Sequence, residues 1–455
     1  RSSFCRPGLR ILFVSSAKLA TEADERSRVN HFCCLVSAGC IVYNYRVMSN
    51  YPQLLVSDKK GTIFSVPFLE ACGMAAGYFS RLSVKDLIPL PSCSQLFMLP
   101  GRVAVAFDPS GGNFVRLEEH PLSPGEPCSP VAAFMAPGYT GTFSAAFDQG
   151  MVKDPLPLFS YTAAVFFKGQ FYAAGVRVDR ERRQDPRYMD LALMRKNIRA
   201  FKKRFPGNRL IAHLENCACV NGCPAAKNFF LQRYEAPLPT SPTCNCQCLG
   251  CISYQPKKTL IPATQLRIRF VPKPEEIAEV ALHHINHVAD PVVSFGQGCE
   301  GEPLMVADVL EKAIKLIRGR TRKGVINLNT NASRPLDVAR LFDAGLDSIR
   351  VSINSLQEEL YHAYYRPRGY TFKDVLQSIE AAGKRGGFVS LNYLVMPGLT
   401  DSRQEFSALN QFLSRRHIDM IQWRNLNFDP LAYFHRLKYA PDPDALLGVK
   451  DVIRR

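Results

Sequence analysis

Hydrophobic and polar positions follow two different patterns along this chain of 455 residues. From about residue 48 to residue 210, short apolar runs such as RVAVAFD (102–108) and PVAAFMAP (130–137) are separated by proline and glycine. Short apolar runs bounded by turn residues are typical of β-strands. In FFKGQFYAAGV (166–176), two halves rich in β-forming residues flank Lys168-Gly169, which predicts a hairpin. We therefore expect a small, strand-rich α+β domain over residues 48–235.

After the proline-rich stretch APLPTSPT (236–243), which we interpret as a linker, strand patterns alternate with amphipathic helix patterns. The strand patterns are PVVSFGQ (291–297), VINLNTN (325–331), DSIRVSINS (347–355), FVSLNYLVMPG (388–398) and MIQWRNLNF (420–428). With an opening strand that ends near Thr243, they make six βα units. Such alternation predicts parallel strands joined by right-handed helical crossovers. The expected fold class is therefore α/β, with a partial (βα)6 TIM-like barrel over residues 236–430 and a C-terminal tail at 431–455.

The composition favours a folded protein with an anionic partner. The chain is 46% hydrophobic, and its 57 Lys and Arg residues against 40 Asp and Glu give a formal net charge of +17. This charge is compatible with nucleic acid, a nucleotide or a phosphorylated substrate and does not select among them. Nucleic acid is a possible partner, but the sequence contains no RNA-binding motif that would support it. We interpret the basic stretch at 177–209 as a solvated face.

The N-terminal 47 residues show neither a sustained period nor the layout of a secretory signal, whereas Met48 begins a segment typical of a protein start. We interpret residues 1–47 as non-native upstream sequence, with a disordered extension as the alternative. No apolar run reaches the roughly 18 to 20 residues that cross a bilayer. The expectation is a cytoplasmic protein without a membrane partner.

Four cysteines lie within TCNCQCLGCISY (243–254), directly after the opening strand pattern. Because the 15 cysteines of the chain are clustered rather than spread, they favour metal ligation in a reducing compartment over a disulfide framework. Structural zinc usually takes four ligands as two pairs, and no second pair follows downstream. Cys244, Cys248 and Cys251, spaced C-x3-C-x2-C, can instead hold three irons of a [4Fe-4S] cluster and leave the fourth iron open. A redox disulfide is the weaker alternative, because C-x3-C-x2-C lacks the thioredoxin-like combination of C-x-x-C with a βαβ unit.

This spacing resembles the radical S-adenosylmethionine (SAM) superfamily, and the resemblance extends over roughly residues 238–430. It implies a [4Fe-4S] cluster and SAM as cofactors, reductive cleavage of SAM to a 5′-deoxyadenosyl radical, and an electron donor such as flavodoxin or ferredoxin. The family spacing leaves Cys246 spare. Gly250 departs from the family, because most members have an aromatic residue before the third cysteine.

SFGQGCEGEPL (294–304) is similar to the Gly-Gly-Glu segment of the superfamily. The amino group of SAM is a cation, which a carboxylate and carbonyl groups beside glycine can bind. The resemblance assigns Gly301 and Glu302 to this contact, with Glu300 as the alternative.

The next strands carry polar residues that we expect near the cofactor. Asn329 lies in a row of amides at period two with Asn327 and Asn331, so the three side chains should share one face. By its order in the chain, the strand IRVSINS resembles the family strand that contacts the ribose. This makes Ser352 and Asn354 candidates for the ribose hydroxyls.

Two further segments are similar to parts of the family. In YRPRGYTF (365–372), Arg366 or Arg368 could contact the SAM carboxylate or the substrate, and a surface arginine is an equal alternative. VMPGLTD (395–401) is similar to the Pro-Gly turn of glycyl-radical activating enzymes, so the backbone at Pro397 is expected along the adenine.

A second cysteine group, HLENCACVNGC (213–223), contains Cys217, Cys219 and Cys223 together with His213. It could bind an auxiliary iron-sulfur cluster or a zinc ion, with Cys299 contributing, or the cysteines could be free. The leading hypothesis is a radical SAM enzyme with an unknown substrate and unassigned catalytic residues. The alternative is a non-catalytic iron-sulfur or RNA-associated binding protein on the same fold.

Overall fold

The computed structural model describes residues 49–121, 123–150, 154–182 and 185–455, so the prediction for residues 1–47 lies outside the described part. The chain divides into two compact units. The first, called here the strand-rich unit, contains the described residues up to Arg177 and the segment Asp429–Leu431. The second, called the barrel unit, contains Val178–Phe428 and Ala432–Arg455.

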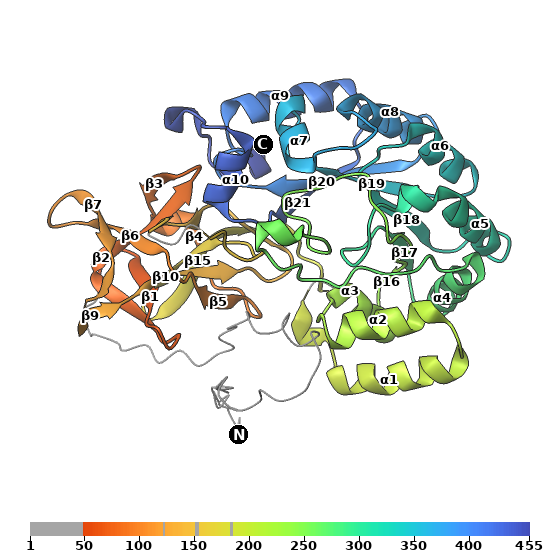
Figure 1. Cartoon of the computed structure of the whole chain (residues 1–455), viewed down its shortest axis with the longest axis horizontal. Helices are drawn as coiled ribbons and strands as arrows, with labels where there is room; N and C mark the ends of the chain where they lie inside the picture. Colours follow the sequence, from red (N-terminus) through yellow and green to blue (C-terminus); the bar gives the residue numbers. More distant parts are fainter. Residues whose placement is uncertain (1–48, 122, 151–153, 183–184) are drawn as a thin grey trace. The chain divides into compact units, whose positions relative to one another are not determined.

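The strand-rich unit consists mainly of antiparallel β-structure, and thirteen of its described strands belong to one sheet (Figure 1). Its strands are β1 (Gln53–Ser57), β2 (Ile63–Ala75), β3 (Tyr78–Arg81), β4 (Leu87–Pro89), β5 (Gln95–Met98), β6 (Val103–Asp108), β7 (Asn113–Leu117), β8 (Glu119–His120), β9 (Ser123–Pro127), β10 (Ser129–Phe134), β11 (Tyr139–Gly141), β12 (Ser144–Ala145), β13 (Phe147–Asp148), β14 (Thr162–Phe167) and β15 (Gln170–Arg177). Buried aromatic side chains such as Phe97, Phe147 and Tyr161 form one part of its core.

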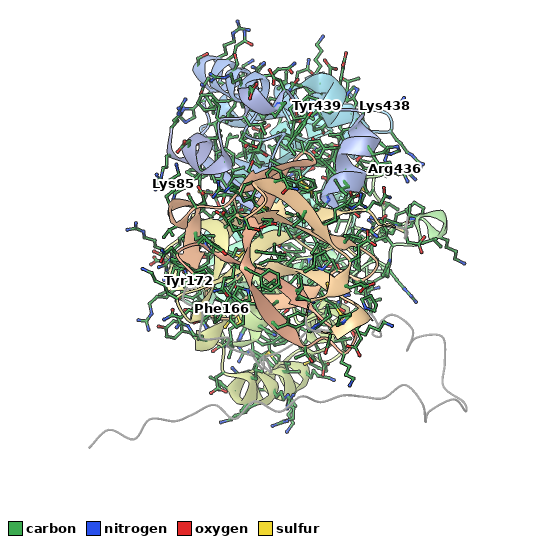
Figure 2. The ribbon with its side chains drawn as sticks, turned by 90° about the vertical axis from the view of Figure 1, so that its left-hand side faces the viewer. Lys85, Phe166, Tyr172, Arg436, Lys438 and Tyr439 are labelled. Carbon is green, nitrogen blue, oxygen red and sulfur yellow. The ribbon has the colours of Figure 1, made fainter. Side chains whose placement is uncertain are left out.

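The predicted hairpin is confirmed, because β14 and β15 pair antiparallel across a two-residue turn. Lys168 and Gly169 both have positive φ, 46° and 77°, as a turn matched to the twist of a hairpin requires. Phe166 and Tyr172 lie on its two strands (Figure 2). The turn chemistry was therefore visible in the sequence.

The barrel unit contains six parallel strands whose order in the sheet is their order in the chain. They are β16 (Glu235–Pro237), β17 (Val292–Phe295), β18 (Val325–Thr330), β19 (Ser348–Ile353), β20 (Phe388–Val395) and β21 (Met420–Asn425). The described helices after residue 178 are α1 (Leu191–Arg204), α2 (Arg209–Cys219), α3 (Pro224–Phe230), α4 (Pro274–His287), α5 (Ala307–Arg318), α6 (Pro335–Asp343), α7 (Glu358–Tyr365), α8 (Phe372–Gly383), α9 (Arg403–Arg415), α10 (Pro430–Leu437) and α11 (Val449–Arg454). The predicted α/β class with a partial (βα)6 barrel is confirmed.

The barrel sheet has one apolar and one polar face, because side chains alternate along each strand. Leu328, Val351 and Leu391 are fully buried on the face that the helices cover. Figure 1 shows α4, α5, α6, α8 and α9 in an arc along that outer side. Asn329, Arg350 and Ser352 have the opposite parity and stay partly accessible, so they line the concave face.

The proline-rich stretch is part of the barrel and not a linker. Ala236 and Leu238 are fully buried, and the Leu238 N–H donates to the Ser294 carbonyl at 2.8 Å. The opening strand ends at Pro237 rather than near Thr243. Prolines are accepted here because β16 is an edge strand, which pairs with β17 alone among the described strands.

The division of the chain differs from the expected boundary at residue 235. Helices α1 to α3 belong to the barrel unit, because the Phe201 ring of α1 packs edge-on against Phe230 of α3 and His283 of α4, with ring centroids 5.5 Å and 4.7 Å away. The expected tail also packs into this unit: Val449 and Val452 of α11 are buried. None of the described helices is long and apolar enough to span a membrane.

Candidate functional site

The cysteine loop, residues 244–251, follows β16 at the carboxyl end of the barrel strands. All four thiols are partly buried. The Sγ atom of Cys246 lies 3.4 Å from that of Cys244 and 3.5 Å from that of Cys248. Cys246, which the family spacing leaves spare, therefore lies between two of the predicted iron ligands. The fourth thiol, Cys251, accepts a contact from the Arg267 guanidinium at 3.5 Å.

The end of α7 holds the cysteine loop. The last carbonyl groups of a helix have no partner within the helix. Here the carbonyls of Tyr364 and Tyr365 accept the N–H groups of Leu249 and Gln247 at 3.0 Å and 2.9 Å. These long-range hydrogen bonds were not predicted. The sequence pattern of α7 indicates its amphipathic face, but it does not indicate which N–H groups bind to its last carbonyls.

Gly250 has little room for a side chain. A Cβ atom at this position would lie 3.1 Å from the Tyr364 hydroxyl oxygen and 3.3 Å from the Asn427 carbonyl. Tyr364 is buried, and its pKa is raised by that burial and further by the charge of Cys248. The Tyr364 hydroxyl of α7 therefore occupies the space next to position 250.

The loop after β17 runs directly against the segment that leads to the cysteines. The Gly301 N–H donates to the Ser241 carbonyl at 2.6 Å, and the Glu302 N–H donates to the Thr243 carbonyl at 2.8 Å. A Cβ atom at Gly301 would lie 1.9 Å from the Thr243 oxygen. Only glycine permits this approach, so the Gly-Glu segment is fitted to the cysteine loop and is more than an ordinary turn.

The two carboxylates of this loop have different partners. Glu300 accepts the N–H groups of Thr240, Ser241 and Gln297 at 2.7, 2.9 and 2.7 Å, which fixes the start of the cysteine segment. Burial raises the pKa of Glu300, and its hydrogen bonds from Thr240, Ser241 and Gln297 oppose that shift. Its oxygens are therefore committed to the backbone.

Glu302, the predicted contact to the SAM amine, lies against the end of β18. It accepts the N–H groups of Asn331 and Leu304 at 2.8 Å and 3.1 Å and the Thr330 hydroxyl at 2.5 Å. Burial raises its pKa to about 7. The pKa of the Cys244 thiol is raised by its contact with Cys246, by burial and by the charge of Glu302.

The predicted row of amides does share the concave face of the sheet. Asn327 Nδ2 donates to Asn329 Oδ1 at 3.2 Å, and Asn329 Nδ2 donates to the Gly296 carbonyl at 2.9 Å. Asn331 reaches the cysteine loop, where it donates to Asn245 Oδ1 at 2.8 Å. The amides therefore connect the barrel interior to the proposed cluster.

Arg350 is a residue of this face that the sequence interpretation missed. Its Nη1 donates to Asn329 Oδ1 at 3.1 Å, and the two residues are paired in register on β19 and β18. The alternation Ile349-Arg350-Val351 was a usable indication, because a charge between two fully buried apolar residues on a strand must point to the opposite face.

The two predicted ribose contacts are placed differently. Ser352 is partly accessible on the concave face. Asn354 is fully buried, and its Nδ2 donates to the Leu360 carbonyl and the Tyr433 hydroxyl at 3.3 Å and 3.1 Å. Among the described residues, Asn354 Oδ1 has no hydrogen-bond donor. Ser352 is therefore the better placed of the two for an accessible ligand.

The remaining predicted residues lie at two helix boundaries. Arg366 is exposed at the end of α7 with a left-handed φ of 48°, and Arg368 is also exposed. Partial removal from water lowers the pKa of Arg366, and the charge of Cys248 opposes this shift. Pro397 is buried in a turn after β20, where the Gly398 N–H donates to Asp401 Oδ1 at 2.6 Å.

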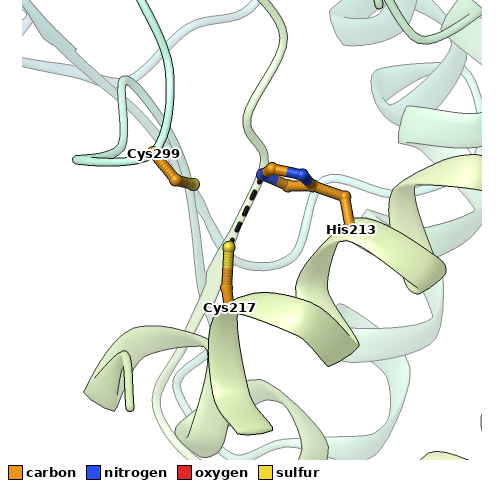
Figure 3. A group of neighbouring side chains, drawn as sticks. All are labelled: His213, Cys217 and Cys299. Carbon is orange, nitrogen blue, oxygen red and sulfur yellow. Dashed lines mark hydrogen bonds between the residues drawn. The ribbon is translucent and has the colours of Figure 1, made fainter. Parts of the chain in front are cut away.

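The second cysteine group is rearranged relative to the sequence prediction. His213, Cys217 and Cys299 place their ligand atoms within 4.8 Å of one another (Figure 3). Cys219 is exposed and outside this group, since it lies two residues after Cys217 and so on the other side of α2. The hydrogen bond between Cys217 and Cys299, together with the neighbouring His213, lowers the pKa of Cys217 to about 5.

Residues 238–409 match the family model of the radical SAM superfamily. This match identifies residues 238–409 as a radical SAM domain, and enzymes of that superfamily use a [4Fe-4S] cluster and SAM. The three thiols after β16 and the glycine-acid loop beside them fit these cofactors.

Two curated relatives are GTP 3′,8-cyclases by name. The probable enzyme of Thermococcus kodakarensis is 40% identical over 104 residues, 22% of this chain and 32% of that protein. The enzyme of Pasteurella multocida is 30% identical over 200 residues, 43% of this chain and 53% of that protein. A solved structure of methylornithine synthase has a TM-score of 0.33 and 15% identity, over 58% of this chain and 72% of that one. The chain spans between 27% and 53% of the length of the curated relatives that it matches.

Proposed function

We propose that the protein is a radical SAM enzyme that binds a [4Fe-4S] cluster through Cys244, Cys248 and Cys251 and cleaves SAM reductively. One observation supports this most directly: the Gly301-Glu302 turn is hydrogen-bonded to residues 241 and 243 next to the cysteines. When bound, the cluster and SAM supply a primary carbon radical that abstracts hydrogen from the substrate. Such an enzyme needs a substrate and a reductant, and we propose flavodoxin or ferredoxin as the reductant.

We assign the following roles to residues around the site. Glu302 accepts hydrogen bonds from the SAM amino group, and the backbone at Gly301 supports that contact. Ser352 binds a ribose hydroxyl, and Asn354 is the second candidate for that contact. Arg366 binds the SAM carboxylate at the mouth of the barrel. The backbone at Pro397 lies along the adenine.

The substrate is proposed to bind at the concave face that Asn329 and Arg350 line. The hydrogen bond of 3.1 Å between these two side chains fixes their orientation before the substrate binds. They therefore form a preorganised polar surface for a substrate. Because the matched relatives are GTP 3′,8-cyclases by name, nucleoside triphosphates are the first substrate class to test.

The experiment that tests the assignment of ligands compares four alanine variants after anaerobic reconstitution. Cys244→Ala, Cys248→Ala and Cys251→Ala are expected to lose the cluster, seen as a loss of most of the about four irons per chain. Cys246→Ala is the matched control from the same loop and is expected to retain the iron. If Cys246→Ala loses the cluster and one of the other three keeps it, the assignment is wrong.

A second measurement separates an enzyme from an iron-sulfur binding protein. Addition of SAM to the reduced cluster should change its electron paramagnetic resonance spectrum, because SAM binds at the open iron. An unchanged spectrum at saturating SAM would favour the non-catalytic alternative.

A further inference from the structure

We propose that His213, Cys217 and Cys299, with Cys223 as the fourth ligand, bind a single zinc ion that fastens α2 to the loop after β17. This site is separate from the proposed cluster and does not depend on the proposed function. It takes a thiophilic divalent cation, and its role is to support the loop that contains Glu300 and Glu302.

The geometry of the three side chains already fits one tetrahedral ion. His213 and Cys217 are four residues apart on α2, so both project from the same face of that helix. Figure 3 shows both side chains directed toward Cys299. Cys217 Sγ lies 3.5 Å from His213 Nε2. Zinc bonds of about 2.3 Å to sulfur and about 2.0 Å to nitrogen at a tetrahedral angle would separate these two atoms by about 3.5 Å.

The same distances argue against an auxiliary iron-sulfur cluster. The ligand atoms of all three residues lie within 4.8 Å of one another. A cluster would stand between its thiolates and hold them farther apart than a single ion does. The burial of Cys217 and Cys299, with exposed fractions of 1% and 4%, suits a structural ion with no open position for water.

Cys223 is the candidate fourth ligand. The chain turns back after α2 so that the Cys223 N–H donates to the Cys217 carbonyl at 2.9 Å. This contact brings a partly buried thiol to the same end of the helix. The resulting set of three cysteines and one histidine is a known ligand set of structural zinc, which binds cysteines as thiolates.

The site is linked by short steps to the proposed SAM loop. The Ile268 N–H donates to the Cys299 carbonyl at 2.8 Å, while the neighbouring Arg267 contacts the Cys251 thiol at 3.5 Å. The residue after Cys299 is Glu300, which holds the backbone at Thr240 and Ser241. An ion at Cys299 would therefore hold the base of the loop on which the cysteine segment rests.

The test is metal analysis of the full chain purified without added metal. We expect about one zinc per chain in the wild-type protein, and its loss in Cys217→Ser and in Cys299→Ser. Cys219→Ser is the matched control, because this exposed thiol lies on the same helix outside the group, and it should retain the zinc. Cys248→Ala should lose iron and keep zinc, which separates this site from the proposed cluster.

Cobalt substitution keeps the proposal testable if a variant does not fold. Co²⁺ added to the metal-free wild-type protein should give the visible bands of a tetrahedral ion and the near-ultraviolet charge transfer of thiolate ligands, which weakens by about a third in Cys223→Ser. Wild-type protein with neither zinc nor these bands would overturn the proposal. So would iron in place of zinc at Cys217 and Cys299, or a metal-free disulfide between them. Unchanged bands in Cys223→Ser would remove Cys223 from the ligand set.

Discussion

At the level of single residues, Gly250 and Tyr364 explain how the cysteine loop accommodates its departure from the family pattern. The Tyr364 side chain of α7 occupies the space next to Gly250, and its hydroxyl oxygen would lie 3.1 Å from a Cβ atom at that position. Cys246 is a similar case, because its thiol lies between Cys244 and Cys248. Neither contact could be predicted, because sequence spacing does not show which distant helix packs on a loop.

The first prediction concerns Gly250. Gly250→Phe restores the usual family residue and is expected to lower the free energy of unfolding by about 1–3 kcal/mol, because the new ring overpacks against Tyr364. Denaturant unfolding of the two proteins measures the difference. Gly250→Ala should cost less, and adding Tyr364→Ala to the phenylalanine variant should recover part of the loss. A phenylalanine variant as stable as the wild type would show that the space is larger than described.

The second prediction concerns the pH dependence of SAM binding. Burial raises the pKa of Glu302 to about 7, so below that pH its carboxyl group is protonated and must lose the proton to pair with the SAM amine. The dissociation constant should rise by up to about tenfold for each pH unit below 7 and level off above it. Glu302→Gln should bind more weakly and without this slope between pH 6 and pH 8. Isothermal titration of the cluster-loaded protein measures both, and equal slopes would contradict the role.

The same shift has the opposite sign for folding. The folded carboxyl of Glu302 keeps its proton to about pH 7, whereas the unfolded one loses it near 4.5. The folded state therefore binds more protons between these values, and the contribution of Glu302 to stability falls as the pH rises from about 4.5 to 7.

At the level of elements, the alternation of strands and helices over residues 291–428 could be predicted, because the spacing of hydrophobic residues within each βα unit indicates its strand and its helix. The first strand could not be predicted, because a segment with Pro237 and Pro239 has the composition of a linker. It is a strand because β16 pairs with β17. The group of His213, Cys217 and Cys299 was only partly predictable. The spacing on α2 is local, but Cys299 reaches it through the fold.

The third prediction compares two glycines in different elements. Gly301→Ala places a Cβ atom 1.9 Å from the Thr243 carbonyl oxygen, so the loop after β17 must move away from the cysteine segment. SAM affinity should fall at least about tenfold, because one displaced contact costs on the order of 1.4 kcal/mol. Gly383→Ala at the end of α8 is the control, since no described atom outside its own stretch of helix lies within 4 Å of its Cβ position. Equal SAM affinity in both variants would show that the loop is not fixed by Gly301.

At the level of the whole molecule, the unit that contains the barrel begins before the family domain does. The match to the superfamily covers residues 238–409, whereas the compact unit starts at Val178. Helices α1 to α3 add an aromatic core around Phe201 and the two proposed zinc ligands His213 and Cys217. The sequence change at residue 236 was therefore a change of pattern and not the border of a folding unit.

The fourth prediction tests this extended unit. Phe201 is buried and its ring packs on Phe229, Phe230 and His283, so Phe201→Ala should cost about 3–5 kcal/mol. If α1 belongs to the barrel unit, this variant should also retain less iron after reconstitution. Leu191→Ala on the same helix, where the side chain is 49% exposed, should change stability by no more than about 0.5 kcal/mol. If Phe201→Ala retains all of its iron despite a large loss of stability, helices α1 to α3 do not support the barrel as predicted.

The measurement that tests the central claim most directly is the release of 5′-deoxyadenosine. Anaerobically reconstituted protein should form it from SAM over time when dithionite is present, and Cys248→Ala should form none. Omission of either SAM or dithionite should also abolish the product. A wild-type protein that holds about four irons per chain and yet releases no 5′-deoxyadenosine under these conditions would contradict the assignment as a radical SAM enzyme.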